Sequence, residues 1–155
     1  MIITILLKFM KEKLVNKKYA KIKEYWNVIN SIEKTGKCPF CPENFKYHKK
    51  PIYKKIDGWL ITKNSWPYKN AKHHLVIIGE KHKTNFAELD EKDLKAVKKL
   101  TDWAIKKFKI KGGAITLRFG DSKYTGATVG HLHFHLISPA LDKKKNAKVV
   151  YFPIG

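Results

Sequence analysis

The segment 131–138 constrains the fold more than any other part of the chain, because three histidines alternate with Leu132, Phe134 and Leu136. Alternation with period two is typical of a β-strand, whose successive side chains point to opposite faces. We therefore expect three imidazoles on one face and apolar side chains packed in a core on the other. At roughly 3.3 Å rise per residue, neighbouring imidazoles lie about 6–7 Å apart, so one ion binds two of them but hardly three. The plainer alternative is three unrelated surface histidines.

The overall composition indicates one folded domain with a strong positive field. The chain has 155 residues, of which 43% are hydrophobic, and this excludes disorder as a description of the whole. Its formal net charge of +20 favours polyanions such as nucleotides, nucleic acid or an anionic membrane. Arg118 is the only arginine among 33 basic residues, and specific base readout depends mainly on arginine. A lysine-rich surface therefore fits a biased composition as well as nucleic-acid binding.

The compartment is predicted from the cysteines and the first residues. Two cysteines three positions apart do not form a secreted disulfide scaffold. Residues 1–10 are apolar but too short for a membrane span, which needs about 20 residues, and no small-residue cleavage site follows them. We expect a cytoplasmic protein that does not enter a membrane.

The first part of the chain reads as helix. Residues 8–34 carry apolar side chains at spacings of three and four among many lysines, which is typical of an amphipathic helix. Two helices broken near Asn16 fit the pattern equally well. We expect this segment to pack on the rest of the chain, although a basic amphipathic helix also suits binding to a membrane or a partner.

Strands and one further helix are expected after this segment. Residues 58–64, 73–79 and 114–120 have the β-branched and aromatic content of strands, and residues 149–152 form a possible short strand. Between them, residues 88–108 predict a helix with Asp90 as its N-cap. The apolar stripe expected on that helix consists of Leu94, Val97, Leu100, Ala104 and Phe108. Trp66 and Tyr68 flank Pro67 and are expected in the core, with base stacking as the alternative.

The sequence His-Leu-His-Phe-His-Leu-Ile at 131–137 resembles the signature of the histidine triad (HIT) family of nucleotide hydrolases and transferases. The small-residue loop before it, residues 124–130, is similar to the loop that precedes the motif in that family. Residues 64–78 resemble an earlier strand–loop–strand of the family, particularly in its dinucleoside polyphosphate phosphorylase branch. The resemblance covers about two thirds of the chain, from Cys38 to Pro139.

This resemblance implies an α+β fold, with an antiparallel sheet of about five strands and helices packed on it. Residues 1–36 then form an N-terminal helical extension, and residues 37–155 form the HIT-like catalytic domain. Members of the family commonly pair through the long helix and the sheet edge, so a homodimer is expected by resemblance.

The resemblance also implies roles for particular residues. His133, the middle histidine, is the expected nucleophile, His135 holds phosphate oxygens, and His131 supports the strand through zinc or a backbone carbonyl. The residues expected to bind the substrate are Asn64, His74, Gly126, Ala127 and Thr128, the last three mainly through backbone amides.

A Cys-x-x-Cys pair, Cys38 and Cys41, allows three interpretations: a redox motif, a zinc site or buried thiols. Zinc-bearing members of the HIT family use such a pair with two histidines. Carried over to this sequence, the resemblance implies structural zinc bound by Cys38, Cys41, His82 and His131, with no organic cofactor.

One position departs from the family pattern. Many HIT hydrolases carry Asn or Gln eleven residues before the first triad histidine, pointing at the α-phosphate, whereas this chain has Gly120. Asp121, Ser122 and Arg118 are candidates to replace that side chain.

The activity implied is cleavage of an α-phosphate linkage, in a dinucleoside polyphosphate or in AMP joined to another group, through a covalent nucleotidyl-histidine. The substrate expected is an adenine nucleotide. One alternative is a nucleic-acid-binding or DNA/RNA-adenylate-processing protein that uses the lysine surface. Another is a metalloenzyme in which His131 and His133 share a catalytic ion, which conflicts with a closed zinc site.

Overall fold

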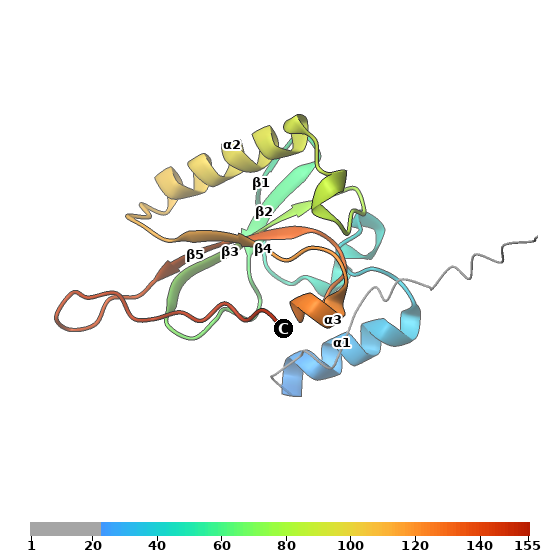
Figure 1. The fold of residues 1–155 in the computed structure, drawn as a ribbon, viewed down its shortest axis with the longest axis horizontal. Helices are drawn as coiled ribbons and strands as arrows, with labels where there is room; N and C mark the ends of the chain where they lie inside the picture. Colours follow the sequence, from blue (N-terminus) through green and yellow to red (C-terminus); the bar gives the residue numbers. More distant parts are fainter. Residues whose placement is uncertain (1–22) are drawn as a thin grey trace, which may run out of the picture.

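The computed structural model describes residues 23–155 (Figure 1). Three α-helices and five strands make up most of this part, with two short 3₁₀ segments between them. The helices are α1 (Lys23–Thr35), α2 (Glu91–Lys107) and α3 (Ser122–Thr125), and the 3₁₀ segments are η2 (Pro42–Tyr47) and η3 (Phe86–Glu88). The strands are β1 (Ile52–Ile56), β2 (Trp59–Lys63), β3 (Ala71–Gly79), β4 (Ala114–Leu117) and β5 (His133–Pro139). No helix among residues 23–155 is long and apolar enough to span a membrane.

All five strands form one antiparallel sheet in the order β1-β2-β3-β5-β4. The histidine strand β5 therefore lies inside the sheet, hydrogen-bonded to β3 on one side and β4 on the other. In this register Val76 pairs with His135, and Ile78 pairs with His133. Because β5 is held on both edges, its side chains have fixed directions.

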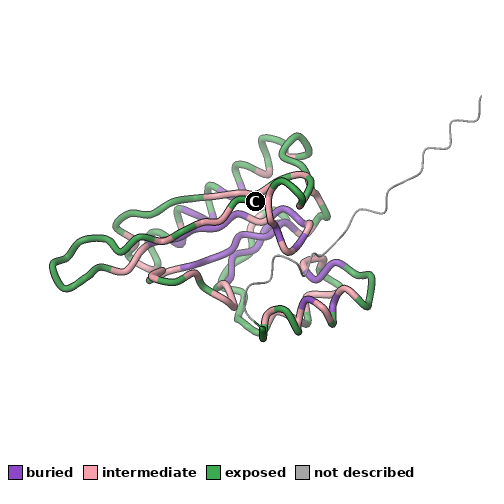
Figure 2. Tube along the Cα trace, turned by 60° about the horizontal axis from the view of Figure 1, so that its bottom comes forward, coloured by how far each residue is buried: buried purple, intermediate pink, exposed green. Residues whose placement is uncertain are grey.

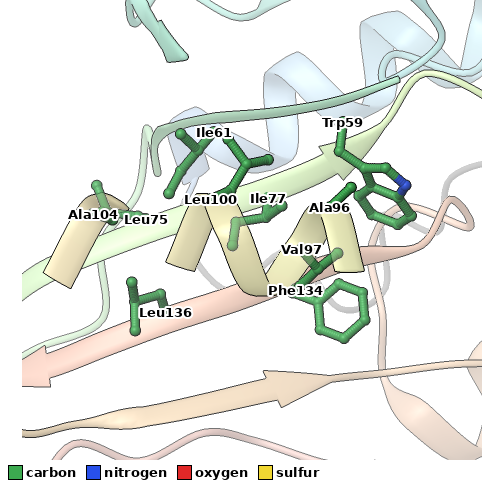
Figure 3. Close-up of a cluster of buried hydrophobic side chains, with 10 residues drawn as sticks. All are labelled: Trp59, Ile61, Leu75, Ile77, Ala96, Val97, Leu100, Ala104, Phe134 and Leu136. Carbon is green, nitrogen blue, oxygen red and sulfur yellow. The ribbon is translucent and has the colours of Figure 1, made fainter. Parts of the chain in front are cut away.

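The core occupies the sheet face that α2 covers, and α1 and α3 lie on the other side of the sheet (Figure 1). Figure 3 shows this core, where side chains from β2, β3 and β5 meet one stripe of α2. Phe134 and Leu136 belong to it, which confirms the expected alternation along β5. The buried residues of the cluster are Trp59, Ile61, Leu75, Ile77, Ala96, Val97, Leu100, Ala104, Phe134 and Leu136.

Helix α2 begins where its capping residue predicts. The Asp90 side chain accepts a hydrogen bond from the Asp93 N–H, and the Asp93 side chain accepts one from the Asp90 N–H, so a capping box fixes the first turn. The prediction that helix begins at residue 88 is wrong, because η3 and its own cap precede Asp90. Leu94, expected in the apolar stripe, is 42% exposed.

Helix α1 confirms the helical part of the N-terminal prediction from Lys23 onward, and the expected helix over residues 8–22 lies outside the described residues. Its buried side chains, Ile29 and Ile32, pack against Cys38 and Val129. Figure 2 shows buried positions on α1 as well as along the central strands.

Three other sequence-based boundaries need correction. The expected strand 114–120 ends at Leu117, because Gly120 has φ 78° and donates its N–H to the Thr84 carbonyl. Strand β5 begins at His133, so His131 precedes it. Residues 149–152 form no strand, and the only bridge near them joins Leu141 to Ala147.

Candidate functional site

A cavity of about 520 Å³ lies on the sheet face opposite α2. His133 and His135 of β5 line it, as do α1, the loop after β2, the loop after α3 and the C-terminal segment. Of the residues expected to bind substrate, Asn64, Gly126 and Thr128 line the cavity. His74 and Ala127 are buried beside it without lining it.

Hydrogen bonds fix which nitrogen of His133 carries the proton. His133 Nδ1 lies 2.7 Å from the carbonyl oxygen of His131, which can only accept, so Nδ1 carries the proton and Nε2 keeps its lone pair. Burial lowers the pKa of His133 to about 4, against the bond to the His131 carbonyl, which raises it, and the charges of His131 and Arg118 lower it further. The imidazole is therefore neutral at pH 7, which is the nucleophilic form.

A second chain of hydrogen bonds orients His135. The Tyr68 N–H donates to His74 Nδ1 at 3.1 Å, so the proton of neutral His74 is on Nε2, which lies 2.8 Å from His135 Nδ1. His135 then carries its own proton on Nε2. That nitrogen is buried and has no partner among the described residues. An N–H donor is thus left for a ligand, and the pKa of His135 lies well below its usual value because of burial and neighbouring His133 and His74.

Asn64 lies beside His74 in this series of hydrogen bonds. Its Oδ1 accepts a hydrogen bond from the Trp66 N–H at 2.8 Å, which fixes the direction of the amide. Its Nδ2 lies 3.1 Å from His74 Nε2, and because both nitrogens carry protons in this arrangement they do not bond each other. The Asn64 amide protons are therefore available to an acceptor in the cavity, as the resemblance implies.

The loop after α3 supplies another wall. Gly126 ends that helix in the left-handed conformation, with φ 65°, and a Cβ there would lie 2.6 Å from the Gly155 carbonyl oxygen. The Thr128 hydroxyl is hydrogen-bonded to Tyr25 of α1, and Tyr25 in turn packs on Trp66 with ring centroids 4.4 Å apart. The N-terminal helix therefore completes the cavity, which its place outside the motif did not predict.

The four expected metal ligands converge away from the cavity. One ligand atom from each of Cys38, Cys41, His82 and His131 lies within 4.8 Å of the others. His131 Nε2 donates to the Gly79 carbonyl at 2.6 Å, so its Nδ1 lone pair faces the cluster, 3.4 Å from Cys38 Sγ and 3.2 Å from His82 Nδ1. Two thiolates and two imidazoles are the donor set of a closed tetrahedral zinc site. This group can bind a metal ion.

The geometry does not favour the redox interpretation of the cysteines. The pair lies between α1 and η2, whereas a thioredoxin-type motif opens an α-helix after a strand. Burial raises the pKa of Cys41 to about 12, and reactive cysteines have a lowered pKa.

Other cavity residues carry no motif, and sequence reasoning missed them or placed them elsewhere. Trp66 and Tyr68, expected in the core, line the cavity together with His48 and the unassigned residues Tyr151 and Pro153. Arg118 also lines it, and the sequence had marked this residue both as the only arginine and as one of three candidates to replace the amide missing at Gly120.

Two neutral histidines above a cavity, on a five-stranded antiparallel sheet with a Cys₂His₂ cluster beside it, define a protein of the histidine triad class. The chain belongs to the family described as "Scavenger mRNA decapping enzyme C-term binding", whose model matches residues 37–150, and with it to the HIT superfamily. This confirms the identification made from residues 131–137.

Solved HIT structures have the same fold. A HIT family hydrolase from Clostridium thermocellum is 25% identical, with a TM-score of 0.51 over 71% of this chain and 94% of that one. A zinc-bound histidine triad family protein from Mycobacterium smegmatis is 16% identical, with a TM-score of 0.53 over 70% and 79%. A histidine triad protein from Clostridium difficile is 18% identical, with a TM-score of 0.53 over 75% and 96%. No curated protein matches the chain in sequence.

Proposed function

We propose that the chain cleaves the α-phosphate linkage of a dinucleoside polyphosphate, or of AMP joined to another group, through a nucleotidyl group carried on His133. The observation that carries this proposal is the fixed proton on His133 Nδ1, which leaves Nε2 unprotonated in the cavity. The hydrolase from Clostridium thermocellum, similar in fold, agrees with this class of reaction.

In the first step the His133 Nε2 lone pair forms a bond to the α-phosphorus, and the bond from phosphorus to the leaving group breaks with its electron pair on the leaving group. The proton stays on Nδ1 and remains hydrogen-bonded to the His131 carbonyl, which stabilises the positive charge that develops on the ring. The unpartnered Nε2–H of His135 donates to a phosphate oxygen, together with the backbone amide of Thr128. The amides of Gly126 and Ala127 already donate to the Ser122 carbonyl and the Thr125 hydroxyl. In the second step water or another hydroxyl acceptor attacks phosphorus and releases its proton to solvent, while the P–Nε2 bond breaks and His133 leaves as neutral imidazole.

The metal cluster has a structural role in this proposal. Zinc, when bound, cross-links the segment after α1 to the end of β3 and to His131, and it supplies no chemistry to the phosphate. His131 is committed through Nε2 to Gly79 and through Nδ1 to the cluster, and neither nitrogen reaches the cavity. A catalytic ion shared by His131 and His133 is therefore not part of the proposal.

The cavity volume of about 520 Å³ suits a nucleotide-sized ligand. Diadenosine tetraphosphate is the first substrate to test. The family description names an mRNA decapping enzyme, so a capped dinucleotide belongs in the same panel. Adenylated nucleic acid belongs there too, as a member of the AMP-linked class suited to a lysine-rich surface.

Product analysis tests the proposal, with a matched pair of variants. His133→Asn removes the nucleophile, whereas His73→Asn makes the same change on β3, outside the cavity. We expect the first to abolish turnover and the second to leave it unchanged. AMP plus ATP from diadenosine tetraphosphate means hydrolysis, and ADP plus ATP only with added phosphate means phosphorolysis. Undiminished turnover in His133→Asn, or no product from any member of the panel, would contradict the proposal.

A further inference from the structure

The residue that replaces the family's amide side chain at Gly120 can be identified from the geometry. Gly120 itself does not line the cavity, and its N–H is bound to the Thr84 carbonyl. Asp121 is the N-cap of α3, where its side chain accepts from the Lys123 N–H, and Ser122 is the first residue of that helix. Neither of these two lines the cavity, whereas Arg118 does.

Arg118 follows β4 and is held in place on several sides. Its Nε and Nη2 both donate to the Pro153 carbonyl, Nη2 also donates to Tyr68 Oη at 3.1 Å, and its guanidinium carbon lies 4.0 Å from the centre of the Phe152 ring. Nη1 makes none of these bonds, so its two N–H groups remain for a ligand. A guanidinium fixed in this way needs little reorganisation to bind an anion.

Among the described residues, no Asp or Glu side chain neutralises the charge of Arg118. Every partner that holds it is neutral: a carbonyl, a phenol and an aromatic ring. Within residues 23–155 no carboxylate forms an ion pair with it, and no Asp or Glu lines the cavity. A half-buried cation with only neutral partners is costly unless an anion completes the site.

We propose that Arg118 binds a phosphate group of the nucleotide through Nη1, in the role that an amide side chain at position 120 would otherwise have. The proposal rests on the proposed function, because it needs a phosphate in the cavity. It makes the C-terminal segment a positioning element, since the Pro153 carbonyl accepts hydrogen bonds from both Nε and Nη2 of the guanidinium. The sequence left Arg118, Asp121 and Ser122 as candidates, and only the first satisfies both the placement and the charge.

A comparison of adenosine with AMP tests this contact, because the two differ only by the phosphate. The dissociation constants of both are measured for the wild type, Arg118→Gln and Arg118→Lys. A charged hydrogen bond to phosphate contributes about 10- to 100-fold in affinity. We expect Arg118→Gln to lose that factor for AMP and none for adenosine, and Arg118→Lys to lose less. An unchanged preference for AMP in Arg118→Gln would overturn the proposal.

Phe152→Leu is the control for the C-terminal segment, because it loosens that segment and keeps the guanidinium. We expect it to leave a clear preference for AMP over adenosine. If it abolishes the preference as fully as Arg118→Gln does, Arg118 acts only by holding the segment and the proposal fails.

A second measurement uses the unmodified protein. Phenylglyoxal modifies arginine preferentially, and Arg118 is the only arginine in the chain, so mass spectrometry of the peptide that contains it reports the modification of this one residue. We expect AMP to slow the modification and adenosine not to, and equal rates with and without AMP would overturn the proposal even if a variant fails to fold. A wild type that cleaves diadenosine tetraphosphate but gives those equal rates would refute only the role of Arg118. A wild type that neither binds AMP nor cleaves any substrate would refute the proposed function as well.

Discussion

Asp93 joins β2, the loop after β3 and the start of α2, because its carboxylate has a hydrogen-bond partner in each of them. Its carboxylate accepts hydrogen bonds from the Trp59 indole of β2, the Lys83 ammonium and the Asp90 N–H. The Lys83 carbonyl in turn accepts the Leu132 N–H, next to His131 and His133. We predict that Asp93→Asn destabilises the protein because the Lys83 cation loses its counter-ion.

The magnitude follows from the pKa of Asp93. Burial alone would raise it, but Lys83, the Asp90 N–H and Trp59 outweigh burial and lower it from 3.8 to about 2. Each pKa unit corresponds to about 1.4 kcal/mol, and with a modest discount for solvent screening the carboxylate contributes about 2 kcal/mol at pH 7. Because the folded pKa is the lower one, this stability is complete above the unfolded pKa of 3.8 and is lost as pH falls through about 2. At pH 3 about half remains.

Urea unfolding at pH 7 and pH 3 checks this prediction. We expect Asp93→Asn to lower the free energy of unfolding by about 2 kcal/mol at pH 7 and by about 1 kcal/mol at pH 3. Asp102→Asn is the matched control, since its ion pair with Lys98 has side chains 71% and 57% exposed and should matter little. A difference that is equal at the two pH values, or equal to that of the control, would refute the reasoning.

Two further predictions concern the metal site and the β4–β5 edge. Removal of metal by a chelator should lower both the melting temperature and the free energy of unfolding. The loss of free energy is about 4 kcal/mol if free zinc had exceeded the dissociation constant about 1,000-fold. Cys41→Ser should reproduce this loss without added chelator. An unaltered melting temperature after complete metal removal would contradict a structural metal. Gly113→Ala should cost about 1–3 kcal/mol, because its Cβ would lie 2.2 Å from the Ile137 carbonyl oxygen. Gly112→Ala, with nothing within 4 Å, is the control, and equal stability of the two variants by urea unfolding would contradict the clash.

The parts of the fold that the sequence predicts well are those with a strong periodic or capping signal. Strand β5 alternates with period two, and Phe134 packs in the core while His133 faces the cavity. Helix α2 begins after Asp90 because that residue and Asp93 cap each other, a local interaction readable from spacing. The resemblance to the HIT family then named four expected metal ligands one by one, and the structure brings these four residues together.

Strand β1 shows why other parts were missed. It lies at the sheet edge with four exposed residues and two lysines, so neither burial nor alternation marks it. Its stability comes from pairing with β2, which the isolated segment does not reveal. A usable signal did exist: Asp57 and Gly58 both have positive φ, as a two-residue hairpin turn requires, and Asp-Gly is a strong hairpin signal.

The cavity wall was unpredictable for a different reason. Arg118 and Pro153 lie 35 positions apart and belong to no shared periodic element. Their contact depends on the path of the C-terminal segment, which carries no regular secondary structure over residues 150–155. Periodicity and capping signals act over a few residues, so they cannot predict a contact of this kind.

The three histidines also show what a motif leaves out. In the sequence they are equivalent, yet each ring has a different partner: His131 the Gly79 carbonyl, His133 the His131 carbonyl, and His135 the ring of His74. Because a carbonyl only accepts and His74 donates, these partners fix the proton position on all three rings. His131 is left with a lone pair at the Cys₂His₂ cluster, His133 with a lone pair in the cavity, and His135 with an N–H donor in the cavity. The carbonyl that orients His133 belongs to His131, one of the four residues of the Cys₂His₂ cluster. The cluster is therefore connected to His133, the proposed nucleophile, through the backbone of His131, although none of the four cluster residues lines the cavity.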